Sequence, residues 1–344
     1  MIKIQNIYYM LSYAFGVLQQ EGYQTVTNEE FDHVGDLLAA ILAKGIAHQI
    51  KRGLGREYSS CSEPLSSLSG KIDVTATIKQ QTLRRKQLVC SFDVFSENVY
   101  LNQILKTTTF VLLGSSEIAT RQKKALRKVM LYFAEVDVLN PRQIKWSGIT
   151  YHRNNATYKM LIHVCYMVIQ GLLLTETTGS TKLGRFLNDQ KMHSLFQKFV
   201  LEYYRKHYPN CKASGAYIPW DVGDGASDWL PVMKTDITLE YKGRTLIIDT
   251  KYYSRTMQMN SLYNNRTLHS NNLYQIYTYV KNRDTTHSGN VSGLLLYAKT
   301  DEEITPNHDY TLGGNRIGVR SLDLNTDFTE IAKQLDRIAN TIFS

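Results

Sequence analysis

Two aspartates and a lysine in the second half of the chain have the types and spacing of a hydrolytic site. Strand-like runs flank the Lys-Gly pair at 242–243, which favours a tight turn, so the segment predicts a β-hairpin. If the loop is symmetric about that pair, Asp236 faces Asp249, and Lys251 lies on the same face as Asp249. Facing carboxylates repel each other, and next to the aliphatic run at 246–248 a divalent metal would neutralise them.

The chemistry that these residues suit is metal-assisted hydrolysis of a phosphate ester. Mg²⁺ prefers oxygen ligands and needs only one or two carboxylates from the protein. The metal would polarise a phosphoryl oxygen and activate a water, and Lys251 could orient that water or stabilise charge on phosphorus. The alternative is an exposed hairpin with scattered charges. The aliphatic run argues against it, because Asp249 ends what reads as an interior strand.

A glutamate on a preceding helix could join this site. The segment 191–207 has helical spacing, and Glu202 lies on or beside its buried face, three residues after Phe199. A carboxylate in that position needs a partner, since burying it alone is costly. The partner could be a metal, or equally Arg205 or Lys198 on the same helix.

The helix that follows the hairpin carries a second polar pair. Gln275 and Tyr279 are four residues apart and therefore share a face of the helix predicted at about 270–282. Taken alone, they read as an ordinary polar pair. Their position on the helix after the Asp-x-Lys segment becomes informative when the motifs are considered together.

These features together resemble the PD-(D/E)xK nucleases, and especially the branch related to RecB nuclease domains. The resemblance covers roughly residues 190–300, with Thr235 in place of the nominal proline. It implies a mixed sheet flanked by helices and a Mg²⁺ site. The residues that the resemblance assigns to the site are the metal ligands Asp236, Asp249 and Glu202, the catalytic Lys251, and Gln275 and Tyr279.

Motifs along nearly the whole chain narrow the resemblance to the McrC family, the nuclease subunits of GTP-dependent restriction systems for modified cytosine. These motifs lie at 6–14, 52–54, 70–73, 91–97, 102–106, 195–202 and 249–253. The resemblance implies a bacterial endonuclease that acts on double-stranded DNA with an McrB-type AAA+ GTPase hexamer. The partner would bind GTP, the N-terminal half would insert into its ring and stimulate it, and the nuclease domain could self-associate.

Composition agrees with a globular protein that binds a polyanion. The chain has 344 residues, 43% of them hydrophobic, and a formal net charge of +9. A basic balance suits nucleic acid but does not establish it. Four dispersed cysteines, with no signal peptide and no membrane-spanning apolar run, are typical of a cytoplasmic protein with free thiols.

The element pattern predicts an α/β (α+β) fold in two domains. Pro141 and a polar stretch at 151–156 suggest a boundary near residue 150. The expected domains are a mixed α/β partner-binding domain at 1–150 and a nuclease domain at 151–344. Smaller expectations are an exposed loop from Arg52 to Ser69, strands at 70–78 and 87–95, and a loop at 254–268.

Motifs that are missing limit the other functions. The sequence has no G-x-x-x-x-G-K-[ST], so the chain is not expected to hydrolyse nucleotide alone, and no zinc or serine-hydrolase motif occurs. Two alternatives to a restriction nuclease remain open. One is a RecB-like repair nuclease without an McrB partner, and the other is a non-catalytic activator of a ring NTPase.

Overall fold

The computed structural model divides the chain into two compact units, one of which is built from both ends of the chain. Unit 1 comprises Met1–Val34 and Lys182–Ser344, and unit 2 comprises Gly35–Thr181. The structure describes residues 2–16, 29, 31–152, 155, 157–178, 189–223, 228–252, 257–260, 265–299 and 305–343. The division differs from the single boundary predicted near residue 150.

Packing of two helices explains the difference. Helix α7 (Tyr158–Thr178) packs on α5 (Tyr100–Gly114), so it belongs to unit 2. Helix α1 (Ile4–Phe15) packs instead on α8 (Asp189–His207) of unit 1. Short-range sequence patterns predicted these helices but carry no information about their long-range partners.

Unit 1 is organised around a five-stranded mixed sheet with the order β11-β12-β10-β7-β6. The central strands β7, β10 and β12 are parallel, and the edge strands β6 and β11 are antiparallel to their neighbours. The sheet strands are β6 (Ile237–Tyr241), β7 (Arg244–Lys251), β10 (Val291–Ala298), β11 (His308–Leu312) and β12 (Asn315–Leu322). This mixed sheet confirms the predicted fold class.

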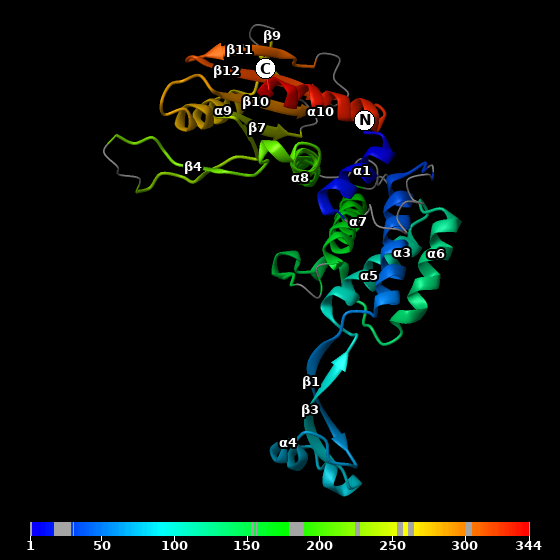
Figure 1. Cartoon of the computed structure of the whole chain (residues 1–344). Helices are drawn as coiled ribbons and strands as arrows, with labels where there is room; N and C mark the ends of the chain where they lie inside the picture. Colours follow the sequence, from blue (N-terminus) through cyan, green and yellow to red (C-terminus); the bar gives the residue numbers. More distant parts are fainter. Residues whose placement is uncertain are drawn as a thin grey trace. The chain divides into compact units, whose positions relative to one another are not determined.

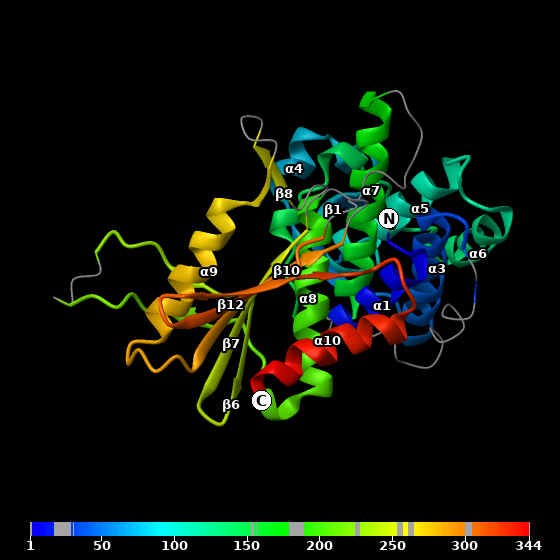
Figure 2. The same ribbon diagram turned by 90° about the horizontal axis from the view of Figure 1, so that it is seen from above.

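Helices cover both faces of the sheet (Figures 1 and 2). Helix α9 (Ser270–Arg283) lies on one face, where Ile276 and Val280 join Ile247 and Leu295 in an apolar core. Helices α8 and α10 (Phe328–Phe343) contact the sheet from the other side. Within the described residues, none of the helices combines the length and apolarity needed to span a bilayer.

The first helix is fastened to unit 1 by polar and aromatic contacts. Asn6 is buried, and its side-chain amide donates to the carbonyls of Leu324 (2.8 Å) and Thr326 (2.7 Å). Tyr9 stacks on Phe328 at 4.3 Å between ring centroids. Because buried polar groups need partners, these bonds specify where α1 docks.

Two short hairpins complete unit 1. Strands β4 (Tyr217–Ile218) and β5 (Met233–Lys234) pair ahead of the sheet. Strands β8 (Met257–Asn260) and β9 (Asn265–Leu268) pair where a loop was predicted, so that prediction was wrong. Residues 253–256 and 261–264 of the predicted loop lie outside the described residues.

Unit 2 combines a helical body with a projecting β-hairpin (Figure 1). The body contains α3 (Val34–Arg52), α5, α6 (Thr120–Met130) and α7. The hairpin pairs β1 (Glu57–Leu65) with β3 (Leu88–Ser96) over nine residues each, which spans about 30 Å. The strand predicted at 87–95 is confirmed, whereas the predicted loop from Arg52 to Ser69 contains β1.

The end of this hairpin carries the small elements β2 (Lys71–Ile72), α4 (Val74–Lys79) and the 3₁₀ helix η1 (Thr82–Arg85). Residues 66–87 are called the fingertip below. The strand predicted over 70–78 is mostly helix, because the Asp73 side chain accepts from the Ala76 N–H at 2.8 Å and caps α4.

Candidate active site

The hairpin that carries the predicted site has the expected register. Lys242 and Gly243 both have positive φ, at 46° and 80°, as a two-residue turn between antiparallel strands requires. Ile237 pairs with Ile248, and the pairing continues without a bulge to the turn. One step beyond this ladder, Asp236 therefore lies across from Asp249 at the end of β7.

Asp249 is a buried carboxylate with 2% of its surface exposed. Its pKa is raised to about 6: burial is the largest cause and the Asp236 carboxylate adds to it, while Lys251 and His193 act in the opposite direction. The repulsion expected between the facing aspartates does contribute to this raised pKa, but burial is the larger cause. A carboxylate that is costly to ionise in the free protein is suited to receive a cation.

Asp236 is held by the strand that it faces. Its Oδ2 atom accepts from the Thr250 N–H at 2.8 Å and from the Thr250 hydroxyl at 2.7 Å. Its Oδ1 atom accepts no hydrogen bond from any residue that the structure describes. One carboxylate oxygen is thus fixed by the protein while the other remains available.

Lys251 connects this pair to α9. Its Nζ atom lies 2.8 Å from Asp249 Oδ2 and donates to Gln275 Oε1 at 3.1 Å. Gln275 Nε2 donates to the Tyr279 hydroxyl at 3.0 Å, and that hydroxyl donates to the Lys234 carbonyl at 3.2 Å. The structure therefore joins Lys251, Gln275 and Tyr279 in one hydrogen-bonded chain that fixes the ammonium group.

His193 on α8 is a neighbour of the site that sequence reasoning missed. Its Nε2 atom lies 2.6 Å from the Thr250 carbonyl oxygen, and its charge acts on Asp249. A lone histidine on an amphipathic helix carries no local signal of such a role, since its partner is 57 residues away.

Glu202 lies away from these residues. It is nine residues after His193 on α8, which is two and a half turns, so the two side chains leave opposite flanks of the helix about 13 Å apart along its axis. Glu202 Oε1 instead pairs with Arg205 at 2.8 Å. This ion pair is the alternative that the sequence left open, and among the described residues Glu202 makes no contact with the cluster.

The remaining groups fit a magnesium ion. Within the described residues, no three His, Cys, Asp or Glu side chains form a ready-made metal cage. Mg²⁺ does not need one, since it retains waters and binds through one or two carboxylates. Asp249 Oδ2 is buried and makes an ion pair, but no hydrogen bond, with a described residue. Asp236 and Asp249 supply hard oxygen donors at one end of β7.

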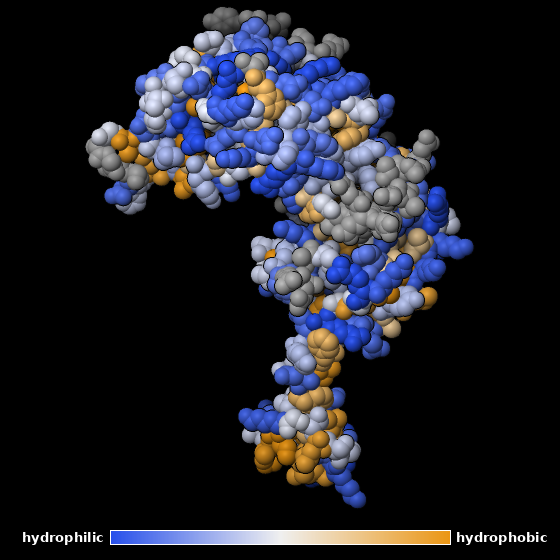
Figure 3. Space-filling view, viewed as in Figure 1, coloured by the Kyte–Doolittle hydropathy of each residue, from blue (hydrophilic) through white to orange (hydrophobic). Residues whose placement is uncertain are grey.

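The fingertip of unit 2 is a second candidate site, for a protein partner. Figure 3 shows hydrophobic residues gathered at its end. Its large exposed apolar side chains are Leu68, Ile72, Val74, Ile78 and Leu83. Contiguous apolar surface on a projecting element is typical of an interaction site. Arg84 and Arg85 in η1 add positive charge beside these apolar residues.

Comparison with solved structures supports the fold. The chain is similar to a chain of the refined half-complex from the tetradecameric assembly of Thermococcus gammatolerans McrB AAA+ hexamers with bound McrC. The TM-score is 0.55 at 16% identity, and the match covers 98% of this chain and 76% of that chain. At this identity, the likeness establishes the architecture alone.

Comparison of sequences establishes the family. The type IV methyl-directed restriction enzyme EcoKMcrBC of Escherichia coli (strain K12) is 28% identical over 338 residues, which is 97% of this chain and 96% of that protein. A family model described as McrBC 5-methylcytosine restriction system component matches residues 3–298. Because this match covers most of the chain, the chain belongs to the family of McrBC 5-methylcytosine restriction system components.

Proposed function

We propose that the chain is the Mg²⁺-dependent DNA endonuclease subunit of a modified-cytosine restriction complex, and that it works with an McrB-type AAA+ GTPase. Unit 1 would cut DNA and unit 2 would engage the partner. The observation that carries the proposal is the cluster of Asp236, Asp249 and Lys251 at the end of β7, in a member of this family.

In this proposal Asp236 and Asp249 hold the metal. When bound, Mg²⁺ would supply a Lewis acid and an activated water. Asp249 would give up its proton on binding, because its pKa of about 6 leaves part of it protonated in weakly acidic solution. Thr250 fixes Asp236 through two hydrogen bonds, so one ligand is already oriented.

Lys251 would act on the reacting phosphate. Its ammonium is held by Gln275, and Gln275 is held by Tyr279, so the cation is positioned before substrate arrives. A preorganised charge can stabilise the negative charge that develops on phosphorus during hydrolysis. Gln275 and Tyr279 are thus proposed as positioning residues. His193 would orient the strand end through the Thr250 carbonyl.

The fingertip would contact the GTPase ring. Its apolar residues are carried about 30 Å along β1 and β3, a length that suits insertion into a partner. GTP would be bound by the partner, since this sequence has no phosphate-binding P-loop motif. A neighbouring gene that encodes an AAA+ GTPase would favour this proposal over a repair nuclease.

Plasmid cleavage tests the proposal. Methylated and unmethylated plasmids would be incubated with the full chain and Mg²⁺, with and without GTP and the cognate partner. Cleavage is expected only with Mg²⁺, GTP and partner together. Asp249→Asn should abolish it and Lys251→Ala should lower it by orders of magnitude, while Lys234→Ala, whose side chain lies over Tyr217 instead, should not reduce it. Full cleavage by Asp249→Asn would contradict the site.

A further inference from the structure

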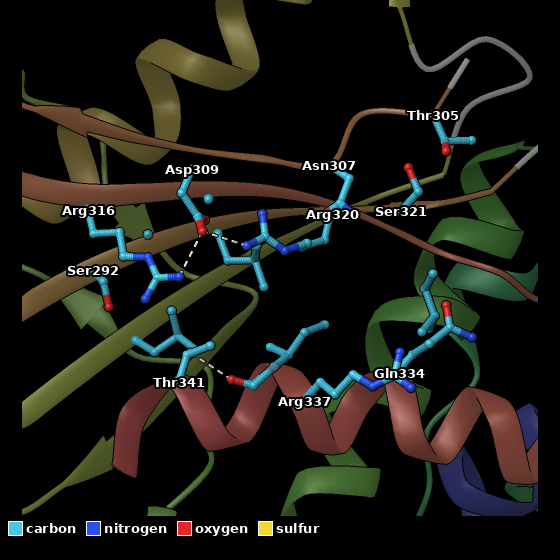
Figure 4. Close-up of a pocket in the computed structure, with 16 residues that line it drawn as sticks. Ser292, Thr305, Asn307, Asp309, Arg316, Arg320, Ser321, Gln334, Arg337 and Thr341 are labelled. Atoms are coloured by element: carbon cyan, nitrogen blue, oxygen red, sulfur yellow. Dashed lines mark hydrogen bonds and ion pairs between the residues drawn. The ribbon is translucent and has the colours of Figure 1, made fainter. Parts of the chain in front are cut away.

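A polar cleft of about 400 Å³ lies between the sheet of unit 1 and α10 (Figure 4). The sheet side contributes Asp309 from β11 and Arg316 and Arg320 from β12, and α10 contributes Gln334 and Arg337. The volume falls within the range of about 300–1,000 Å³ that is usual for ligand sites.

The cleft is on the opposite face of the sheet from the candidate active site. Side chains alternate along β12, so Ile317 and Val319 join the core under α9 while Arg316 and Arg320 point the other way. Lys251 reaches Gln275 on α9. The metal constellation and the cleft are therefore separate sites on one sheet.

Asp309 arranges two of the three arginines. Its Oδ2 atom lies 2.7 Å from a guanidinium nitrogen of Arg316 and 2.7 Å from one of Arg320, as the dashed lines in Figure 4 mark. Gly318 lies directly across the ladder, and a Cβ there would come within 2.8 Å of Asp309 Oδ1. The glycine leaves space for a carboxylate that holds both cations in place.

Asp309 stays ionised and does not cancel the charge of the cleft. Burial opposes ionisation, but hydrogen bonds from Arg320 and Arg316 outweigh it and lower the pKa of Asp309. The cleft is thus lined by three guanidinium groups and one carboxylate, which leaves an excess of positive charge. Arg316 keeps further N–H donors, because a guanidinium has five and only the bond to Asp309 is made to a described residue.

Arg337 is the third arginine of the cleft, and it does not pair with Asp309. In the described part of the chain it makes no hydrogen bond or ion pair, yet it faces the cleft from α10. One turn earlier, Gln334 is fixed by the Asp323 N–H, which donates to Gln334 Oε1 at 3.0 Å. The hydroxyls of Ser292, Ser321 and Thr341 also line the cleft.

We infer that this cleft is a binding site for a phosphate group, with Arg337 as its main donor. Guanidinium forks match phosphate oxygens in geometry, and the excess positive charge favours an anion. The phosphate could belong to a nucleic-acid backbone or to a small phosphorylated ligand. The site is independent of the proposed hydrolysis, because it lies on the other face of the sheet.

Binding measured without metal tests this inference in the full chain. In EDTA, a fluorescent duplex would be titrated over a range of salt concentrations, and inorganic phosphate would be tested by its effect on the melting temperature. Arg337→Ala should weaken duplex binding several-fold and reduce the slope of log K against log salt by about 0.9. Arg337→Lys should retain most of the binding.

Lys333→Ala is the matched control, since it removes one charge from the same helix at an exposed residue that pairs with Glu330 outside the cleft. A loss specific to Arg337→Ala for the duplex would identify a nucleic-acid backbone. A loss of phosphate stabilisation alone would identify a small phosphorylated ligand. If Arg337→Ala binds both probes as Lys333→Ala does, the inference is wrong, whatever Asp249→Asn does to cleavage.

Discussion

Lys251 Nζ lies 2.8 Å from Asp249 Oδ2, and the two residues are separated by a single position on β7. The pair places a cation against a carboxylate that is almost fully buried, with 2% of Asp249 exposed. Even so, burial keeps the pKa of Asp249 raised to about 6. The carboxylate therefore carries an electrostatic cost in the free protein that its proposed metal would relieve.

This cost predicts a pH-dependent stability that Asp249→Asn removes. The pKa of Asp249 is about 6 in the folded state and near 3.9 in the unfolded state. The stability contributed by its protonated carboxyl group is therefore fully present below pH 4 and is lost as the pH rises through 6. The loss is about 2–3 kcal/mol. In EDTA, wild type should lose stability over this window relative to Asp249→Asn, as urea melts at pH 4 and 7 would measure. Parallel pH profiles would contradict it.

Tyr279 should act only through Lys251. Tyr279→Phe removes the hydroxyl that links Gln275 to the Lys234 carbonyl, so Lys251 is less well oriented and kcat should fall about tenfold with KM little changed. In a Lys251→Ala background, the same change should have no further effect on turnover. Equal losses in both backgrounds would mean that Tyr279 acts independently.

Two residues of one helix should differ in their effect on metal use. His193→Ala should raise the Mg²⁺ concentration needed for half-maximal cleavage by about tenfold or more, because His193 contacts Thr250, which follows Asp249 on β7 and hydrogen-bonds Asp236. Glu202→Gln is the control, since it breaks only a surface pair with Arg205. A metal requirement shifted by Glu202→Gln instead would return that residue to the site.

The fingertip should control GTP turnover by the partner without affecting the nuclease chemistry. Ile78→Asp and Leu83→Asp place charges on exposed apolar positions, so they should leave folding intact and abolish stimulation of the GTPase. Leu131→Asp, at another exposed apolar residue of unit 2, should stimulate normally. Asp249→Asn should also stimulate, and if it remains bound but fails to do so, the two activities share a site.

Local patterns were enough to predict the hairpin and the helix face that Gln275 and Tyr279 share, whereas the place of that face beside the hairpin came from the family resemblance. The register follows from a two-residue turn, and the contact between Gln275 and Tyr279 follows from helical spacing, so neither needed knowledge of distant contacts. Glu202 and His193 flank the same buried stripe of α8 from opposite sides. Tertiary packing decides which flank of α8 contacts β7, and the sequence pattern does not distinguish the two flanks.

Neither the cleft nor the assembly of unit 1 from both ends of the chain could be predicted from the sequence, because both depend on long-range pairing. In the sequence, Arg316 and Arg320 are two of many scattered charges, and Arg337 lies in an amphipathic helical segment. Only the antiparallel edge strand β11, which was not predicted, brings Asp309 between the first two. Long-range pairing also decides that α1 joins α8.

The docking of α1 on α8 has a consequence for synthesis on the ribosome. After α1 emerges, about 190 further residues must be made before its partner helix is complete, which takes roughly ten to forty seconds at ordinary elongation rates. Unit 2 can fold during that interval, while the apolar side of α1 remains exposed to solvent. The nascent chain should therefore be a chaperone client until translation of unit 1 ends.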